Sequence, residues 1–323
     1  MTEFRNDKLL SALKEADSIL LCSHVSPDGD TIGSVLALAF MLEDMGKKVT
    51  CACADPVPGS LHFLPCWEMF VRPEDIEGMK FDCAVAVDAA DEGRLGPLAK
   101  PFRKAPVQLQ IDHHGTNPGY AMENEVDAKA SATGCIIWRL MKAFGCEITE
   151  EYAEALYVAI NSDTGNFCFE NTNEECFECM TDLMKSGLKL NIIARNLNLL
   201  REVPHLRLLG RALGTLNISA DGRIAGMMLR KHDYIDCDAP REYNSKIVNY
   251  AMDIPGVEMA YLADETDEGT KFSLRAQPPR NVAVIATEFG GGGHILAAGC
   301  RIRGKMIDEA AEMIEHRMQE QLE

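Results

Sequence analysis

No stretch of the sequence approaches the run of about twenty apolar residues that a membrane-spanning helix needs. The N-terminus also lacks the pattern of a signal peptide, because residues 1–8 lead into a charged helical segment. Internal repeats and low-complexity tails are absent as well. We therefore expect a cytoplasmic globular protein that has no membrane partner.

Basic residues are scarce. Lysine and arginine total 32 against 50 aspartates and glutamates, which gives a formal net charge of −18, and no run of basic residues occurs. Long nucleic acid is bound by lysines and arginines that displace its counterions. The composition therefore excludes long nucleic acid as a partner, and a phosphate-containing substrate should be small.

The chain is long enough for two domains, with 323 residues of which 46% are hydrophobic and 25% charged. Its twelve cysteines lie mostly in apolar or helical settings, which favours buried reduced thiols over disulfides. Strands that alternate with helices predict an α/β fold, a doubly wound and mostly parallel sheet with helices on both faces. We expect this domain at residues 1–187, a helical linker at 188–213, and a smaller α/β domain at 214–323.

The sequence also predicts several helices in the second half of the chain. Residues 173–213 are helical in pattern throughout, apart from an interruption at Pro204. In the second domain we expect helices at 240–252, with Asp238 as the N-cap residue, at 281–289 and at 307–321.

The most informative stretch is residues 18–34. An apolar strand at 19–22 leads to His24, and Asp28 and Asp30 follow in a turn that precedes a helical pattern. The three side chains therefore lie at the carboxyl edge of a sheet, where open α/β folds place their sites. Histidine and aspartate are ligands that divalent metals choose. The structural alternative is that Asp30 only caps the following helix.

Further acidic or histidine side chains follow three other predicted strands or helices. They are Asp88, Asp91, Asp112, His113, His114 and Asp163. Four segments that converge on one sheet edge would leave a cluster of repelling carboxylates, which is costly unless cations neutralise it. Two divalent ions would match four ligand aspartates. The pattern favours a two-metal site, which activates a bridging water for in-line attack on phosphorus.

Motifs in both halves resemble one family of enzymes. His-x-x-x-Asp-x-Asp at 24–30, Asp-x-x-Asp at 88–91, Asp-His-His at 112–114 and Asp-Thr-Gly at 163–165 resemble the four motifs of the DHH phosphoesterase family. Ser-Leu-Arg at 273–275 and Gly-Gly-Gly-Gly-His at 290–294, with Ala-Ala-Gly at 297–299, resemble the substrate-binding domain of its nanoRNase and pAp-phosphatase branch. The resemblance covers nearly the whole chain.

The resemblance implies a ligand set for two metal ions. The ligands would be His24, Asp28 and Asp88 for one ion, and Asp30, Asp88, His113 and Asp163 for the other. His114 would face the scissile phosphate, Asp112 would orient a ligand histidine, and Asp91 would serve the site or only cap a helix. The family usually uses manganese, so we expect Mn²⁺, with Mg²⁺ or Co²⁺ as alternatives.

The resemblance also implies a substrate pocket in the second domain. Consecutive glycines let a backbone approach a phosphate and present N–H groups to it. The expected pocket residues are Arg275, Gly291, Gly292, Gly293 and His294. Ala276 departs from the family pattern, which often has serine at that position.

The function implied is a metal-dependent phosphodiesterase that converts very short RNA and linear dinucleotides to mononucleotides, and 3′-phosphoadenosine 5′-phosphate (pAp) to AMP. A manganese inorganic pyrophosphatase is an alternative, but its C-terminal domain lacks the Gly-Gly-Gly-His pattern. A RecJ-like exonuclease would need a longer chain and a more basic channel. A non-catalytic nucleotide-binding regulator would not need the complete ligand set. The oligomeric state stays open, a homodimer included.

Overall fold

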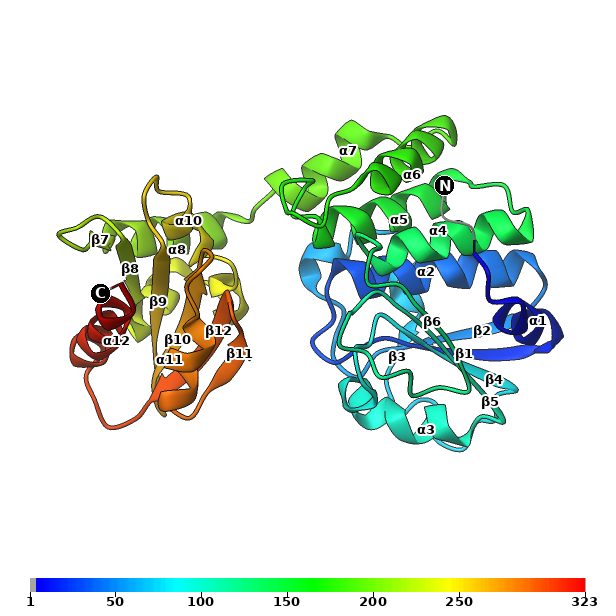
Figure 1. The fold of residues 1–323 in the computed structure, drawn as a ribbon, viewed down its shortest axis with the longest axis horizontal. Coiled ribbons are helices and arrows are strands. Elements are labelled where there is room, and N and C mark those ends of the chain that lie inside the picture. Colours follow the sequence, from blue (N-terminus) through cyan, green and yellow to red (C-terminus); the bar gives the residue numbers. More distant parts are fainter. Residues whose placement is uncertain (1–3, 323) are drawn as a thin grey trace. The chain divides into compact units, whose positions relative to one another are not determined.

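Two six-stranded sheets organise the chain, one in each of two units that divide between Leu200 and Arg201. The structure is a computed structural model that describes residues 4–322, and Figure 1 shows the elements of each unit. Residues 1–3 and 323, at the outer ends of the two predicted domains, lie outside the described residues. The division falls inside segment 188–213, which we treated as a linker. Among residues 4–322, no helix combines the length and the apolar character needed to cross a bilayer.

The sheet of the first unit is entirely parallel, in the order β3-β2-β1-β4-β5-β6. Its strands are β1 (Ser18–Cys22), β2 (Lys48–Ala52), β3 (Phe70–Val71), β4 (Cys83–Val87), β5 (Val107–Asp112) and β6 (Glu123–Val126). The chain runs from β1 outward to β3 and then returns to β4 on the other side of β1. The strand order therefore reverses between β1 and β4, at the point where open α/β sheets place their sites.

Side chains of the central strands alternate between two hydrophobic cores. Ile19 and Leu21 pack into the core under one layer of helices, whereas Leu20 and Cys22 pack into the core on the opposite face. The first layer contains α1 (Asp7–Glu15), α2 (Gly29–Asp44), α4 (Thr133–Phe144), α5 (Glu150–Asp163), α6 (Glu174–Lys185) and α7 (Leu190–Ala194). The opposite face carries the 3₁₀ segment η3 (Glu92–Leu98) and α3 (Ala99–Lys104) (Figure 1). The predicted doubly wound sheet with helices on both faces is confirmed.

The second unit is a mixed sheet in the order β11-β12-β10-β9-β8-β7, in which only β8 and β9 pair in parallel. Its strands are β7 (Asn217–Ile218), β8 (Ile224–Leu229), β9 (Met259–Thr266), β10 (Gly269–Ala276), β11 (Gly292–His294) and β12 (Ala297–Ile302). One face packs on α11 (Val282–Glu288) and α12 (Ile307–Leu322). The other packs on α8 (Val203–Gly214), α9 (Lys231–Cys237) and α10 (Asn249–Met252).

Two helix predictions are wrong. The stretch 173–213 is broken after α6, where Gly187 has φ +96°, and again after a π-helical turn (Arg195–Leu199). The stretch 240–252 forms a 3₁₀ turn (Arg241–Asn244) and the short α10, and Asp238 ends α9 in the left-handed region rather than capping a new helix. A left-handed residue ends a helix, and Pro240 biases the residue before it away from helical geometry.

Glycines allow α2 and α5 to approach each other closely. A Cβ at Gly33 would lie 2.3 Å from the carbonyl oxygen of Ala155, and one at Gly29 would lie 2.7 Å from Cβ of Ser162. Both distances are too short for non-bonded atoms, so any larger residue would force the helices apart. Because α5 ends at Asp163, this close packing determines where the Asp163 carboxylate lies.

We therefore expect Gly33→Ala to lower the free energy of unfolding by about 1–3 kcal/mol, as overpacking in a core does. Gly210→Ala is the matched control, because it also adds one methyl group to a helix, but into open space. Urea unfolding followed by circular dichroism would measure both. Equal midpoints for the two variants would show that α2 and α5 tolerate separation.

Candidate metal centre

The ends of three neighbouring strands and two helices meet at the reversal point of the first sheet. β1 is followed by His24, β4 by Asp88, and β5 ends at Asp112, which His113 and His114 follow. The start of α2 adds Asp28 and Asp30, and the end of α5 adds Asp163. The structure thus brings segments that are far apart in sequence to one edge of the sheet.

Three groups of side chains could each hold a metal ion, because within each group the candidate ligand atoms lie within 4.8 Å of one another. They are His24, Asp28 and Asp88; Asp88, His113 and His114; and Asp30, His113 and Asp163. Asp88 and His113 each belong to two groups, so the three groups form one continuous cluster. His114 lies within this cluster, although we expected it to face the substrate rather than a metal.

The Asp88 carboxylate lies between two imidazoles. One oxygen is 3.5 Å from Nε2 of His24, and the other is 3.7 Å from Nε2 of His113 and accepts a 2.8 Å hydrogen bond from the Thr133 hydroxyl. The side chain is almost completely buried, and its backbone adopts φ +60°, a conformation that non-glycine residues avoid. Burial raises the pKa of Asp88, while the hydrogen bond with His24 opposes that rise.

Asp30 joins α2 to α4. Its carboxylate accepts the backbone N–H groups of Thr133 and Gly134, at 2.7 and 3.0 Å, and so caps the first turn of α4. The alternative that Asp30 caps its own helix is wrong, because Asp28 caps α2 by accepting the N–H of Asp30 at 3.0 Å. Complete burial, followed by the charge of Asp88, raises the pKa of Asp30. A nearby cation would offset both effects, because it stabilises the ionised carboxylate.

The two adjacent histidines have different surroundings. Nε2 of His113 is buried and forms no hydrogen bond, although an Asp163 oxygen lies 2.9 Å away and an Asp30 oxygen 3.7 Å away. A buried polar atom without a hydrogen bond is rare, and one facing two carboxylates has the surroundings of a metal ligand. By contrast, Nδ1 of His114 donates to Asp112 at 2.7 Å, and the His114 side chain is 40% exposed.

Asp112 therefore orients His114, whereas the ligand histidines that the resemblance implied are His24 and His113. Nδ1 of His113 instead faces the carbonyl oxygen of Ala130, at 3.3 Å. The hydrogen bond to Asp112 raises the pKa of His114. Burial opposes ionisation of Asp112, but the hydrogen bonds from His114 and Asn117 lower its pKa below the ordinary value.

One neighbour of the cluster was missed by the sequence analysis. Nδ1 of His24 faces the carbonyl oxygen of Val25 at 2.8 Å, and Nη2 of Arg94 lies 3.1 Å from the same nitrogen. Asp91, whose role was open, caps η3 and accepts the N–H of Arg94 at 3.2 Å. An arginine six residues after Asp88 has no recognisable local signal, so only the fold reveals its position.

The residues present suit divalent cations. Burial alone would lower the pKa of His24 and of His113, but the neighbouring carboxylates raise both to about 10. The carboxylates thus favour positive charge at the nitrogens that a metal would bind. Imidazole nitrogens combined with carboxylate oxygens suit first-row divalent metals.

In the second unit, Arg275 and His294 lie in one row across the sheet. Both are paired with Ala297 of β12, Arg275 from β10 and His294 from β11. Directly paired residues point to the same face of an antiparallel sheet, and two strand spacings are roughly 10 Å. The two side chains therefore belong to one face, opposite to the core under α11 and α12.

The glycine run has a structural role. A Cβ at Gly291 would lie 2.1 Å from the carbonyl oxygen of Gly299, and one at Gly293 would lie 2.6 Å from Cα of Ala298. Both glycines are needed for the close approach of β11 to β12. Gly290 and Gly292, by contrast, have open space where a Cβ would lie.

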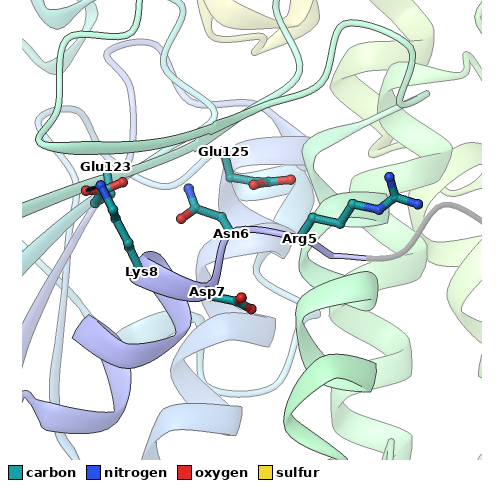
Figure 2. A pocket seen from close by; sticks show the side chains of 6 residues that line it. All are labelled: Arg5, Asn6, Asp7, Lys8, Glu123 and Glu125. Carbon is teal, nitrogen blue, oxygen red and sulfur yellow. Dashed lines mark ion pairs between the residues drawn. The ribbon is translucent and has the colours of Figure 1, made fainter.

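A separate pocket lies beside α1 and β6. Figure 2 shows its six lining residues, Arg5, Asn6, Asp7, Lys8, Glu123 and Glu125, with the ion pair between Lys8 and Glu123 at 3.4 Å. None of the predicted ligands lines it, so it has no part in the centre described above.

An open parallel sheet with aspartates and histidines that could hold metal ions at its reversal point defines an α/β protein with a candidate metal centre. Comparison with known proteins specifies the family. Residues 18–160 match the model of the DHH family N-terminal domain, and residues 233–320 match that of the DHHA1 domain.

Relatives extend the match over both units. The bifunctional oligoribonuclease and PAP phosphatase NrnA of Thermus thermophilus is 32% identical over 308 residues, which cover 94% of this chain and 90% of the relative. The NrnA of Bacillus subtilis is 27% identical and covers 91% of this chain and 92% of its own. The crystal structure of an exopolyphosphatase-related protein from Bacteroides fragilis has a TM-score of 0.91 at 26% identity, covering 97% of this chain and 95% of that one.

The chain therefore belongs to the DHH phosphoesterase family, as its motifs predicted, and it is a hydrolase that acts on phosphoester bonds.

The adjacent histidines provide a direct test of the centre. We expect His113→Ala to retain fewer manganese ions per chain than wild type, because its buried Nε2 faces the carboxylates. His114→Ala should retain the wild-type number, because Nδ1 of His114 is bound to Asp112. Metal analysis after dialysis against Mn²⁺ measures both. The opposite pattern would mean that the two roles are exchanged.

Proposed function

We propose that this chain is a metal-dependent phosphodiesterase that hydrolyses very short oligoribonucleotides and linear dinucleotides to mononucleotides, and pAp to AMP. The observation that carries the proposal is the position of Asp88, which is shared between two groups of candidate ligands. The substrate class is supported by two relatives that are named oligoribonuclease and PAP phosphatase and are similar over almost the full chain.

The residues divide into two overlapping sets. His24, Asp28 and Asp88 would hold one divalent ion, and Asp30, Asp88, His113 and Asp163 the other. We propose Mn²⁺ at both positions, since imidazole and carboxylate ligands suit it. When bound, such ions supply a water of lowered pKa as the nucleophile and positive charge for the phosphoryl oxygens.

We assign His114 to the substrate. Asp112 keeps a proton on Nδ1 of His114, so Nε2 of this half-exposed ring is the atom that can donate to a phosphoryl oxygen. Because Asp112 raises the pKa of His114, the protonated form is favoured. A contact of this kind, made to charge that develops in the transition state, contributes about 10²–10³ in turnover.

Arg275 and His294, with Gly291, Gly292 and Gly293, would hold a terminal phosphate of the substrate. Arg275 forms no ion pair among residues 4–322; Nε donates to the Asn249 side chain at 3.2 Å and Nη1 to the carbonyl oxygen of Leu274 at 3.0 Å. Burial lowers the pKa of Arg275. A partly buried guanidinium without a carboxylate partner is suited to bind an anion.

The substrate class can be tested with purified protein and Mn²⁺. A 5′-phosphorylated diadenylate should be converted to AMP, whereas a 24-nucleotide RNA should react at least about tenfold more slowly, because the acidic chain offers few contacts to a long backbone. Asp88→Asn, which removes the shared carboxylate charge, should be inactive on both. Equal rates on the two RNAs would refute the short-substrate proposal, and rapid cleavage of inorganic pyrophosphate instead would favour the pyrophosphatase.

The second unit can be tested separately. Arg275→Ala should raise KM for the dinucleotide about tenfold or more, since a hydrogen bond to a charged group is lost, and should leave hydrolysis of bis-p-nitrophenyl phosphate unchanged. Arg301→Ala is the control, because Arg301 lies on β12 and is paired with Glu268. If Arg275→Ala reduces both activities together, Arg275 supports the fold and not a substrate pocket.

A further inference from the structure

We propose that Arg94 is a phosphate-binding residue of this active site, whose guanidinium holds a phosphoryl oxygen of the substrate beside His24. The inference rests on the proposed function and adds a residue to it. It also gives Asp91 a purpose, because Asp91 would position the segment that carries Arg94.

Arg94 is a cation that has no anionic partner among the described residues 4–322. Other arginines of the chain, such as Arg103, Arg139 and Arg317, form ion pairs with carboxylates. Among residues 4–322, Arg94 forms none, although the chain has 50 acidic residues against 32 basic ones. Its guanidinium is therefore available to bind an anion that is not part of the chain.

The contact between Arg94 and His24 competes with the contact to Val25, because Nδ1 of His24 cannot both donate to the Val25 carbonyl oxygen and accept from Arg94. Nε2 of His24 faces Asp28 and Asp88, at 3.7 and 3.5 Å, so Nε2 is the atom that would bind a metal ion held by these groups. The proton of the neutral ring would then lie on Nδ1, which faces the carbonyl oxygen of Val25 at 2.8 Å. Nδ1 would have no lone pair left for Arg94, whose N–H groups would need another acceptor.

The backbone of Arg94 is held next to the centre at two points. Its N–H donates to the Asp91 carboxylate, and its carbonyl oxygen accepts the N–H of Val25 at 2.7 Å. Gly96, at φ +54°, lets the chain pass close by, since a Cβ there would lie 2.6 Å from Val25. The backbone is therefore positioned in advance, while the exposed side chain of Arg94 can turn from His24 to a ligand without breaking a buried contact.

The ligand that fits is a phosphate group. A guanidinium presents N–H donors in a planar fork that matches two oxygens of one phosphate. Because the Arg94 guanidinium lies 3.1 Å from His24, it is close enough to contact a phosphate group that is bound at the cluster. The alternative is that Arg94 only supports the His24 ring, in which case its loss would affect metal binding and not phosphate binding.

The test is AMP binding, which requires no hydrolysis. Isothermal titration calorimetry of the manganese-loaded protein should show AMP binding about ten- to a hundredfold more weakly to Arg94→Gln than to wild type. Manganese content should be unchanged, and Arg94→Lys should lie between the two. Arg103→Gln, which removes the same charge from a side chain that is paired with Glu92, should bind AMP as wild type does.

Two results would overturn the inference. One is equal AMP affinity of Arg94→Gln and wild type, including no binding by either. The other is loss of manganese from Arg94→Gln, which would make Arg94 a support of His24. If wild type binds AMP through Arg94 but cleaves no dinucleotide, the proposed function fails and the phosphate-binding role of Arg94 stands.

Discussion

The structure of the first unit depends on the cost of burying aspartates together. Asp30 and Asp88 are almost completely buried, and burial raises the pKa of both carboxyl groups. Two buried like charges are tolerated only when hydrogen-bond donors and cations surround them. The donors come from Thr133, Gly134 and the histidines, and a divalent ion would supply the positive charge that the carboxylates favour beside His24 and His113.

Several residues of the first unit both stabilise the fold and position the cluster. Asp30 caps α4 and offers its carboxylate to the cluster, so the start of α4 and the centre are built from the same hydrogen bonds. Asp91 caps η3 and thereby places Arg94 beside His24. Gly33 allows α5 to approach α2, and Asp163 at the end of α5 reaches His113 as a result. The contacts that stabilise the fold therefore also determine the geometry of the site.

The motifs were sufficient to predict the parallel sheet, the family and the residues that converge, because side chains that follow parallel strands must meet at one sheet edge. The partner of Asp112 was not specified by the motif, since nothing in Asp-His-His shows which imidazole the carboxylate reaches. Arg94 was missed for a similar reason, because it lies six residues beyond Asp88 in a segment whose path no periodic pattern describes. The continuous helix predicted at 240–252 does not form. Its apolar pattern suggested a helix, but Asp238 adopts the left-handed conformation and Pro240 precedes a 3₁₀ turn.

The sequence by itself determined the class of fold, the residue types of the cluster and the scarcity of basic charge, since these follow from periodicity, spacing and composition. Only the tertiary structure decided which carboxylate each histidine faces, which helix Asp30 caps, and that Arg94 lies against His24. Such pairings depend on the approach of helices and loops within a few tenths of an ångström. At Gly33 and Gly96 the close approach is possible because glycine has no Cβ. The approach at Gly33 affects the position of Asp163, which lies far along the chain.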